Sequence, residues 1–437
     1  MFVLFFVAVV LLAHGYLWFR LVRRTTGSGR LRKALTWSVV ALFAVLVATL
    51  VGSRMGLEGW AVWPGFIWLA VMFYLVVILV VLEVPRAVAA AVLRRVGRRR
   101  EPGESVAAPS VVVPPVAVPA GVGAPVEDEV GPADVVVDVP ASGDVPASRD
   151  VPADVPAAPA MSRRLFLDRT TAAIAGVGAL GTVGYGMVSA LGDPVIEPVK
   201  VTLPKLDQRL AGLRFAVVSD IHLGPLTGIG HTERIVRMIN GLEADVVAIV
   251  GDLVDGSVAQ LGALARPLQN LESRYGAYFV TGNHEYFTAE GPGEWIEELA
   301  ELGIRSLRNE RVEIRHQGAV LDLAGVNDVG GAAAGESPDF AKALGGREPG
   351  RSTVLLAHQP IQVKEAARHG VDLQLSGHTH GGQIAPFNLV VGLQQPVVSG
   401  LATVDGVQVY VTRGAGFWGP PVRVGAPPEI TILELRG

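Results

Sequence analysis

Five of the nine histidines in this 437-residue chain lie in short motifs that also contain aspartate, asparagine and glycine. In chain order the motifs are Asp220-Ile221-His222, Gly251-Asp252, Gly282-Asn283-His284-Glu285, His358 and Gly377-His378-Thr379-His380. Carboxylate, amide and imidazole groups suit divalent Mn, Fe or Zn, and two such ions side by side can hydrolyse phosphate esters. The motif set therefore predicts a site for two metal ions that cleaves phosphoester bonds.

Each motif comes directly after an apolar run of strand length, and the runs are 213–218, 246–250, 277–280, 353–357 and 371–375. Helix-like patterns at 232–244, 293–302 and 361–369 alternate with these runs. Further strands are expected in a hairpin at 311–326 and at 407–411 and 429–435. Open α/β sheets bind ligands beyond the carboxyl ends of their strands. We therefore expect an α/β domain over residues 200–437 whose motifs meet at one edge.

The motifs differ in how much each one indicates by itself. Asp-x-His and Gly-Asp are common by chance, and either one alone is more often structural than functional. Gly-His-x-His is rarer, and composition predicts it by accident in roughly one such chain in fifty. Because the motifs occur in order, each after a predicted strand, a metal site is the better interpretation of the set.

Over residues 210–437, about half of the chain, the motifs resemble those of the calcineurin-like metallophosphoesterases. Within that superfamily the chain is similar to the membrane-attached bacterial branch whose signal is of twin-arginine type. The resemblance implies a fold of two packed β-sheets flanked by helices. It also implies that Asp252 bridges two ions, one held with Asp220, His222 and His380, and the other with Asn283, His358 and His378.

The resemblance further implies how the reaction proceeds. Two divalent ions, Mn, Fe or Zn, lower the pKa of a water molecule that bridges them, and the resulting hydroxide attacks phosphorus. His284 matches the histidine that contacts the phosphate and protonates the leaving oxygen. No covalent enzyme intermediate is required.

One stretch departs from the family pattern. Many members follow Gly-Asp with Asn-x-Asp-Arg, whose arginine helps bind the phosphate, whereas this chain reads Leu253-Val254-Asp255-Gly256. The missing arginine disfavours a protein phosphatase, and Asp255 is interpreted as structural rather than as a ligand. Arg413 and Asn327 lie in loops that either face the site or are simply solvated. Trp418 lies in a loop that either packs normally or touches the substrate or the bilayer.

Three long apolar runs, at about 1–19, 34–52 and 60–83, precede this domain. Each approaches the ~20 residues of a membrane-spanning helix. None shows the helical stripe of a core helix, which is the alternative interpretation. Six Arg and Lys residues separate the first two runs, and six Arg follow the third. By the positive-inside rule these basic segments lie in the cytoplasm and the N-terminus lies outside.

Residues 101–160 are rich in Pro, Ala and Val, which favours an extended, disordered linker over a small folded domain. The segment 161–192 contains Ser162-Arg163-Arg164-Leu165-Phe166-Leu167 followed by an apolar stretch rich in Ala and Gly. It resembles a twin-arginine export signal, or else is a basic flank before an ordinary fourth membrane helix. Either one carries the following domain across the membrane. No small-x-small cleavage site is evident, so we expect an uncleaved anchor.

Composition narrows the possible functions. The absence of cysteine excludes disulfides, cysteine-bound zinc and a thiol nucleophile. A net charge of −4 argues against nucleic acid as a partner. We expect a membrane region over 1–100 and a catalytic domain on the periplasmic or extracellular side of the cytoplasmic membrane. Its expected partners are phosphorylated, lipid-linked or cell-envelope substrates, the membrane itself and, for export, the twin-arginine translocase.

Two alternatives remain open. In the first, the domain lies on the cytoplasmic face and cleaves the pyrophosphate of a nucleotide-linked lipid. In the second, the domain is a non-catalytic, metal-bound module that senses the state of the envelope. The complete ligand set together with His284 favours catalysis over sensing, because a sensor has no need of a proton donor.

Overall fold

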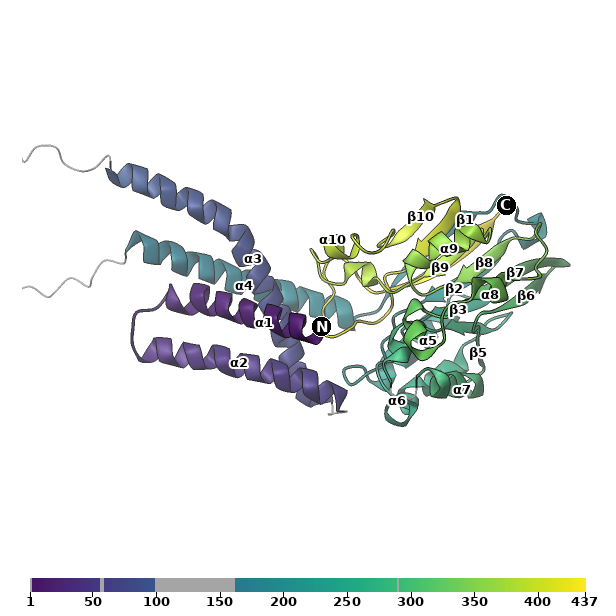
Figure 1. The fold of residues 1–437 in the computed structure, drawn as a ribbon, viewed down its shortest axis with the longest axis horizontal. Coiled ribbons are helices and arrows are strands. Elements are labelled where there is room, and N and C mark those ends of the chain that lie inside the picture. Colours follow the sequence, from purple (N-terminus) through teal and green to yellow (C-terminus); the bar gives the residue numbers. More distant parts are fainter. Residues whose placement is uncertain (1, 56–58, 99–161, 289–290) are drawn as a thin grey trace, which may run out of the picture. The chain divides into compact units, whose positions relative to one another are not determined.

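The computed structural model describes residues 2–55, 59–98, 162–288 and 291–437 (Figure 1). The described residues within 1–83 and 168–437 form one compact unit, and those within 84–167 belong to a second. The linker expected at 101–160 lies outside the described residues, so its extended character stays a prediction.

The body of the domain consists of two six-stranded sheets. The first sheet contains, in spatial order, β1 (Val195–Thr202), β12 (Glu429–Arg436), β2 (Arg214–Val218), β3 (Val246–Val250), β4 (Ala277–Val280) and β5 (Ile304–Ser306). Strands β2 to β5 are parallel, whereas β12 runs antiparallel to β2 and parallel to β1. The carboxyl ends of β2, β3 and β4 therefore lie at the same edge.

The second sheet contains, in spatial order, β10 (Gly400–Val404), β11 (Val407–Val411), β9 (Leu373–Ser376), β8 (Thr353–Leu356), β7 (Ala319–Gly325) and β6 (Glu310–His316). Strands β11, β9, β8 and β7 are parallel, and the β10–β11 and β6–β7 hairpins form the two edges. The expected α/β fold of two sheets flanked by helices, with apolar helices ahead of it, is confirmed.

Alternation along each strand explains how the layers pack. In β3, Val246, Ala248 and Val250 face the other sheet, whereas Val247 and Ile249 face the helices outside. Because both faces of each sheet are buried, the strands are nearly continuous apolar runs in the sequence. The first sheet is covered by α5 (Ile229–Asn240), α6 (Val258–Ala265) and α7 (Gly293–Glu301), and the second by α8 (Phe340–Leu344) and α9 (Val363–Arg368).

The observed strands that precede the motifs agree with the predicted ones to within two residues. The hairpin turns at Gln317 and Gly318, whose φ angles are 50° and 81°, as a tight two-residue turn requires. Helix α5 lies earlier than the predicted 232–244, because the chain is capped at Gly241. Strand β1 begins at Val195, just before the expected start of the domain at residue 200.

The N-terminal helices are α1 (Phe2–Leu17), α2 (Arg30–Arg54), α3 (Gly59–Arg98) and α4 (Arg163–Leu191). Among the described residues, three segments are long and apolar enough to cross a membrane: Arg30–Ser53, Gly59–Ala89 and Arg163–Leu191. Helix α1 has 16 residues, fewer than the ~20 of a full crossing, although Trp18–Arg23 continue it as a π-helix. These helices support membrane association, while the number and direction of the crossings stay predictions.

Candidate metal centre

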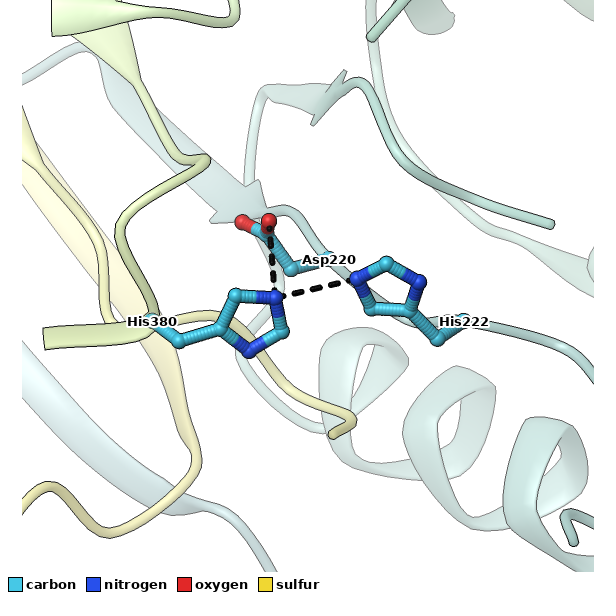
Figure 2. Close-up of side chains that lie close together, drawn as sticks. All are labelled: Asp220, His222 and His380. Atoms are coloured by element: carbon cyan, nitrogen blue, oxygen red, sulfur yellow. Dashed lines mark hydrogen bonds and ion pairs between the residues drawn. The ribbon is translucent and has the colours of Figure 1, made fainter. Parts of the chain in front are cut away.

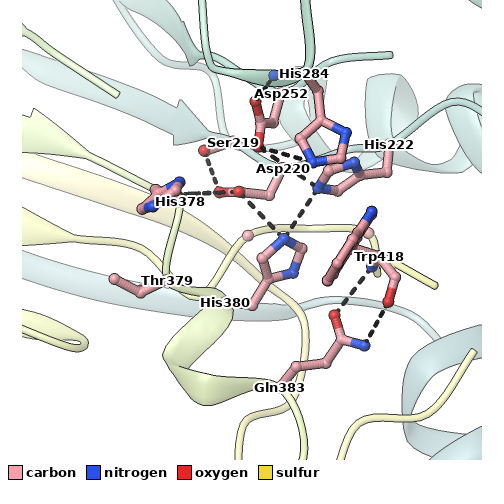
Figure 3. A network of polar contacts seen from close by, with 12 residues as sticks. Ser219, Asp220, His222, Asp252, His284, His378, Thr379, His380, Gln383 and Trp418 are labelled. Atoms are coloured by element: carbon pink, nitrogen blue, oxygen red, sulfur yellow. Dashed lines mark hydrogen bonds and ion pairs between the residues drawn. The ribbon is translucent and has the colours of Figure 1, made fainter. Parts of the chain in front are cut away.

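The structure brings the sequence-predicted site residues together where strands of both sheets end (Figure 3). The first sheet contributes Asp220 and His222 after β2, Asp252 after β3, and Asn283 and His284 after β4. The second sheet contributes His358 after β8, and His378 and His380 after β9. The candidate centre is therefore built at the junction between the two sheets.

The backbone at these motifs adopts an uncommon conformation. Among the described residues, ten non-glycine positions have a positive φ, and five of them are predicted ligands: Asp220, His222, Asp252, His378 and His380. Asp and His visit this region more readily than most residues, but each instance still costs about 1–3 kcal/mol. The concentration of such residues at one place indicates a functional constraint rather than chance.

Asp220, His222 and His380 form the first group of converging donor atoms (Figure 2). His380 Nε2 lies 3.3 Å from Asp220 Oδ1 and 3.0 Å from His222 Nε2. The two imidazole rings are stacked, with centroids 4.9 Å apart. An oxygen and two nitrogens thus point into one small volume, which is the arrangement that a divalent cation requires.

Asp252 belongs to two further groups. Its Oδ2 atom lies 3.2 Å from His358 Nε2, 3.9 Å from His222 Nε2 and 4.0 Å from His284 Nε2. The donor atoms of Asp252, His222 and His284, and those of Asp252, His358 and His378, lie within 4.8 Å of one another in each group. One carboxylate is therefore within reach of both clusters, as a bridging ligand must be.

Asn283 and His378 complete the predicted set. Asn283 Oδ1 is buried and has no hydrogen-bond partner among the described residues, although a buried amide oxygen ordinarily has one. The backbone N–H of His378 donates to both carboxylate oxygens of Asp220, at 3.1 and 3.0 Å. The unpaired oxygen fits a metal ligand, and the His378 bond ties the two halves of the centre together.

Close packing between the loops accounts for two glycines of the motifs. A Cβ atom at Gly282 would stand 2.2 Å from Asp252 Oδ1, and one at Gly377 would stand 2.4 Å from Asp220 Oδ2. Any side chain at either position would displace a predicted ligand. Glycine at 282 and 377 is therefore explained by the close approach of backbone to carboxylate.

Asp255 orients two of the histidines. Its Oδ1 atom accepts hydrogen bonds from His222 Nδ1 at 2.9 Å and from His284 Nδ1 at 2.6 Å. These bonds leave Nε2 of both rings facing the centre. Burial alone would raise the pKa of the Asp255 carboxyl, but the two histidines hold that pKa well below its ordinary value. The position of Asp255 behind the ligands agrees with its interpretation as a structural residue.

The side chain of His284 is 10% exposed, whereas those of His222 and His358 are 0% exposed. Burial lowers the pKa of the His284 ring, but the charges of Asp252 and Asp255 outweigh burial and raise the pKa to about 9. A cation beside Asp252 would oppose this effect, whereas Asp255 would still favour the protonated ring. Trp418 and Phe287 flank the imidazole, with ring centroids 5.9 and 4.7 Å away. The role of proton donor that the resemblance implies for His284 stays a prediction.

Two further contacts fix the ligand loops. His358 Nδ1 donates to the carbonyl oxygen of Val250 at 2.8 Å, which leaves its Nε2 free for a metal. The buried Glu285 carboxylate accepts backbone N–H bonds from Gly282 at 2.6 Å and from Asp252 at 3.1 Å. Glu285 therefore joins the loop after β4 to the loop that carries the bridging carboxylate.

Arg423 is a residue of the site that the sequence did not reveal. Its fully buried guanidinium donates to the carbonyl oxygens of His380 and Arg413, both at 2.8 Å, and of Gly416 at 3.0 Å. Its Nη2 also lies 3.1 Å from His380 Nδ1. Arg423 therefore clamps the loop after β9 against residues 413–416. No motif marks it, since most of its partners are main-chain atoms from distant segments.

The other loop candidates are engaged elsewhere. Arg413 forms ion pairs with Glu429 at 2.6 Å and with Glu197 at 3.3 Å, so its guanidinium is paired with carboxylates rather than simply solvated. Asn327 donates to the carbonyl oxygen of Glu336 at 3.1 Å and is buried. Neither residue therefore has a contact that supports a role in phosphate binding.

The donor set fits divalent metal ions. Two buried carboxylates lie beside imidazole nitrogens, and a bound cation would stabilise this arrangement. All of the donors are oxygen or nitrogen, which suits Mn, Fe or Zn. The geometry establishes a candidate metal-binding cluster, whereas the number and identity of the ions belong to the proposal below.

Two mixed sheets with His and Asp donors at the strand ends are the arrangement that the resemblance to the calcineurin-like metallophosphoesterases implies. Residues 213–382 match the family described as calcineurin-like phosphoesterase. Together with the relatives described next, this match shows that the chain belongs to the calcineurin-like metallophosphoesterase superfamily.

Three relatives illustrate the range of the similarity. A transmembrane protein with metallophosphoesterase domain from Danio rerio is 41% identical over 261 residues, which cover 58% of this chain and 60% of that protein. An uncharacterized metallophosphoesterase from Helicobacter pylori is 40% identical over 262 residues, covering 59% and 68%. Another from Aquifex aeolicus is 34% identical over 223 residues, covering 50% and 83%.

The chain thus spans about 60% of the length of the Danio rerio relative that it matches. The relatives include animal and bacterial proteins, so the similarity is not confined to the bacterial branch that the motifs suggested. Membership of that branch and the twin-arginine signal stay predictions.

Proposed function

We propose that this protein is a membrane-anchored phosphoesterase that uses two divalent metal ions to hydrolyse phosphate ester or pyrophosphate bonds. The observation that carries the proposal is the position of Asp252. Its Oδ2 atom lies 3.2 Å from His358 Nε2 and 3.9 Å from His222 Nε2, and these two histidines belong to different clusters. A carboxylate shared in this way supports two neighbouring ions over a single one.

Each residue has a distinct task in this proposal. Bound ions would supply a water of lowered pKa and would stabilise the negative charge that develops on the phosphate. His284, oriented by Asp255, donates a proton to the leaving oxygen. One ion would be held by Asp220, His222, Asp252 and His380, and the other by Asp252, Asn283, His358 and His378.

We further propose that the substrates are lipid or cell-envelope phosphates and that the domain acts outside the cytoplasmic membrane. Helix α4 ends at Leu191, and β1 begins at Val195, so the anchor joins the domain through a short connection. Tethering raises the effective concentration of any substrate held in the same membrane. The outer side is supported by the basic segments that flank the first apolar runs.

The test is hydrolysis by the full-length protein in detergent or lipid nanodiscs. It would be assayed with Mn, Fe and Zn against phosphate monoesters, diesters and pyrophosphates in soluble and lipid-linked forms. We expect hydrolysis that a chelator abolishes and that added metal restores, with a preference for lipid-linked compounds. A protein that binds metal but cleaves none of these substrates would contradict catalysis and favour the sensor alternative.

A further inference from the structure

An uncharged, apolar loop lies near the metal centre. Residues 383–404 contain no Asp, Glu, Lys or Arg. Around the short helix α10 (Asn388–Val391), the exposed fractions are 46% for Phe387, 70% for Leu389, 53% for Val390 and 87% for Leu393. Contiguous exposed apolar residues of this kind mark a surface that contacts a protein, a membrane or a ligand. We call residues 383–395 the α10 loop.

The α10 loop is joined to the membrane-type helix α4. Ile384, at the start of the loop, packs with Val422 and Val424 into the apolar cluster formed with α4. The carbonyl oxygen of Gly186 in α4 accepts a hydrogen bond from the backbone N–H of Arg423 at 2.9 Å. A Cβ atom at Gly186 would lie 2.5 Å from Val422 Cγ1, so glycine permits this close approach. The α10 loop therefore begins directly beside the last turns of α4.

The same part of α4 is itself apolar and exposed. Val188 is 76% exposed and Leu180 is 64% exposed, within a helix that is long and apolar enough to cross a membrane. Where such a helix leaves the bilayer, residues packed next to it lie at the level of the lipid head groups. The exposed apolar surface of α4 and that of the α10 loop are therefore expected to meet the same bilayer.

The α10 loop is also joined to Trp418, whose ring contacts that of His284. Gln383 Nε2 donates to the carbonyl oxygen of Trp418 at 2.9 Å, and the Trp418 N–H donates to Gln383 Oε1 at 3.0 Å (Figure 3). Trp418 is 57% exposed, and its ring lies edge-on to that of His284. We call the α10 loop together with Trp418 the apolar rim. It runs from the anchor to the proposed proton donor.

We propose that the apolar rim docks onto the phospholipid bilayer that α4 crosses, so that the metal centre opens directly onto lipid head groups. Aliphatic side chains and tryptophan are the residues that insert at this depth, and the absence of charge from the α10 loop lowers the cost of insertion. The phosphate of a membrane lipid could then reach the ligands without leaving the bilayer surface. This substrate assignment rests on the proposed hydrolysis, whereas the docking rests only on the proposed anchoring by α4.

Docking can be tested by labelling a single residue, without any measurement of catalysis. Because the chain has no cysteine, one introduced cysteine is the only site that a thiol-reactive label can modify. Leu393→Cys in the full-length protein would carry a fluorescent label in phosphatidylcholine–phosphatidylglycerol vesicles. Leu401→Cys on β10, where the side chain is 43% exposed, is the matched control. We expect spin-labelled lipid to quench the label at 393 and aqueous iodide to quench the label at 401. Iodide reaching both labels equally, or neither quencher reaching 393, would overturn the proposal.

The consequence for substrate is tested with Leu389→Asp/Leu393→Asp, and Leu401→Asp serves as the control. We expect the double variant to lose at least about tenfold in hydrolysis of a lipid phosphate presented in vesicles, because two apolar contacts with the bilayer become charged. Hydrolysis of a water-soluble nitrophenyl ester should stay unchanged. Equal losses on both substrates, or no loss on either, would overturn the docking role. A wild-type protein that cleaves neither substrate would refute the proposed function and leave the quenching result standing.

Discussion

The metal centre and the apolar rim lie next to each other but differ in what holds their side chains in place and in what they contact. In the centre, Asp255 orients His222 and His284, the carbonyl of Val250 orients His358, and these rings are largely buried. In the rim, the aliphatic side chains are exposed, and a membrane would contact them through area rather than through directed bonds. Catalysis needs preorganised geometry, whereas docking needs only apolar surface. Changes to the two regions should therefore have separable effects.

The largest difference between the effect on the metal centre and the effect on the apolar rim is expected for Asp252→Asn. Replacing the proposed bridging carboxylate removes the charge that both clusters share, so hydrolysis should fall more than about 10⁴-fold and metal content should drop. Elemental analysis and an ester assay measure the two effects. Quenching of the label at residue 393 by lipid should be unaffected. Full activity with an unchanged metal content would refute the assignment of the centre.

His284→Ala should lower the rate of hydrolysis without lowering the metal content. We expect the metal content to stay at the wild-type level while the rate falls roughly 10²–10⁴-fold, as for a lost general acid. The loss should shrink for nitrophenolate, a leaving group that departs without a proton. A loss of the same size for every leaving group would point instead to a role in positioning the substrate.

Asp255→Asn should have a smaller effect, because the ligands themselves remain. The variant weakens the bonds that orient His222 and His284, and such changes typically cost about 10–100-fold in metal affinity or activity. Titration of activity against metal concentration measures the shift. Asp405→Asn, in an exposed turn with a φ of 49°, is the matched control and should behave as wild type. Identical titrations for the two variants would show that Asp255 does not support metal binding or activity.

The smallest effect on the chemistry is expected for Arg163→Lys together with Arg164→Lys, since neither residue belongs to the metal centre. Lysine keeps the positive charge, so the topology signal is preserved. A twin-arginine translocase should reject the change, whereas a general insertion route should tolerate it. Protease added to spheroplasts reports the side on which the domain lies. Complete protection of the wild-type domain would refute the outside location, and digestion of both proteins would remove only the twin-arginine prediction.

The strands and the ligand loops could be predicted because their signals are local. Strands such as β3 are buried on both faces, so they appear as uninterrupted apolar runs. The motif residues follow immediately, and the shared direction of the parallel strands β2, β3 and β4 brings Asp220, Asp252 and Asn283 to one edge of the first sheet. The fold class and the candidate ligands thus follow from short segments taken one at a time.

Other features depend on partners distant in the sequence and gave no such signal. Arg423 is recognisable only through the carbonyl groups that surround it, and those come from two separate loops. Strand β1 is mostly half-buried or exposed, so it lacks a continuous apolar run, and its partner is β12. The contact between Gly186 and Arg423 likewise joins segments that no local pattern relates.

The position of β12 has a consequence for the order in which the domain can be completed. This strand, at Glu429–Arg436, is the last one of the domain in the sequence, yet it lies between β1 and β2 in the first sheet. Strand β1 follows α4 in the sequence, but it cannot pair with β12 until the ribosome has synthesised the far end of the domain. A transporter that accepts only finished folds would have to act after translation, whereas a co-translational route would have to thread the chain before this sheet can close.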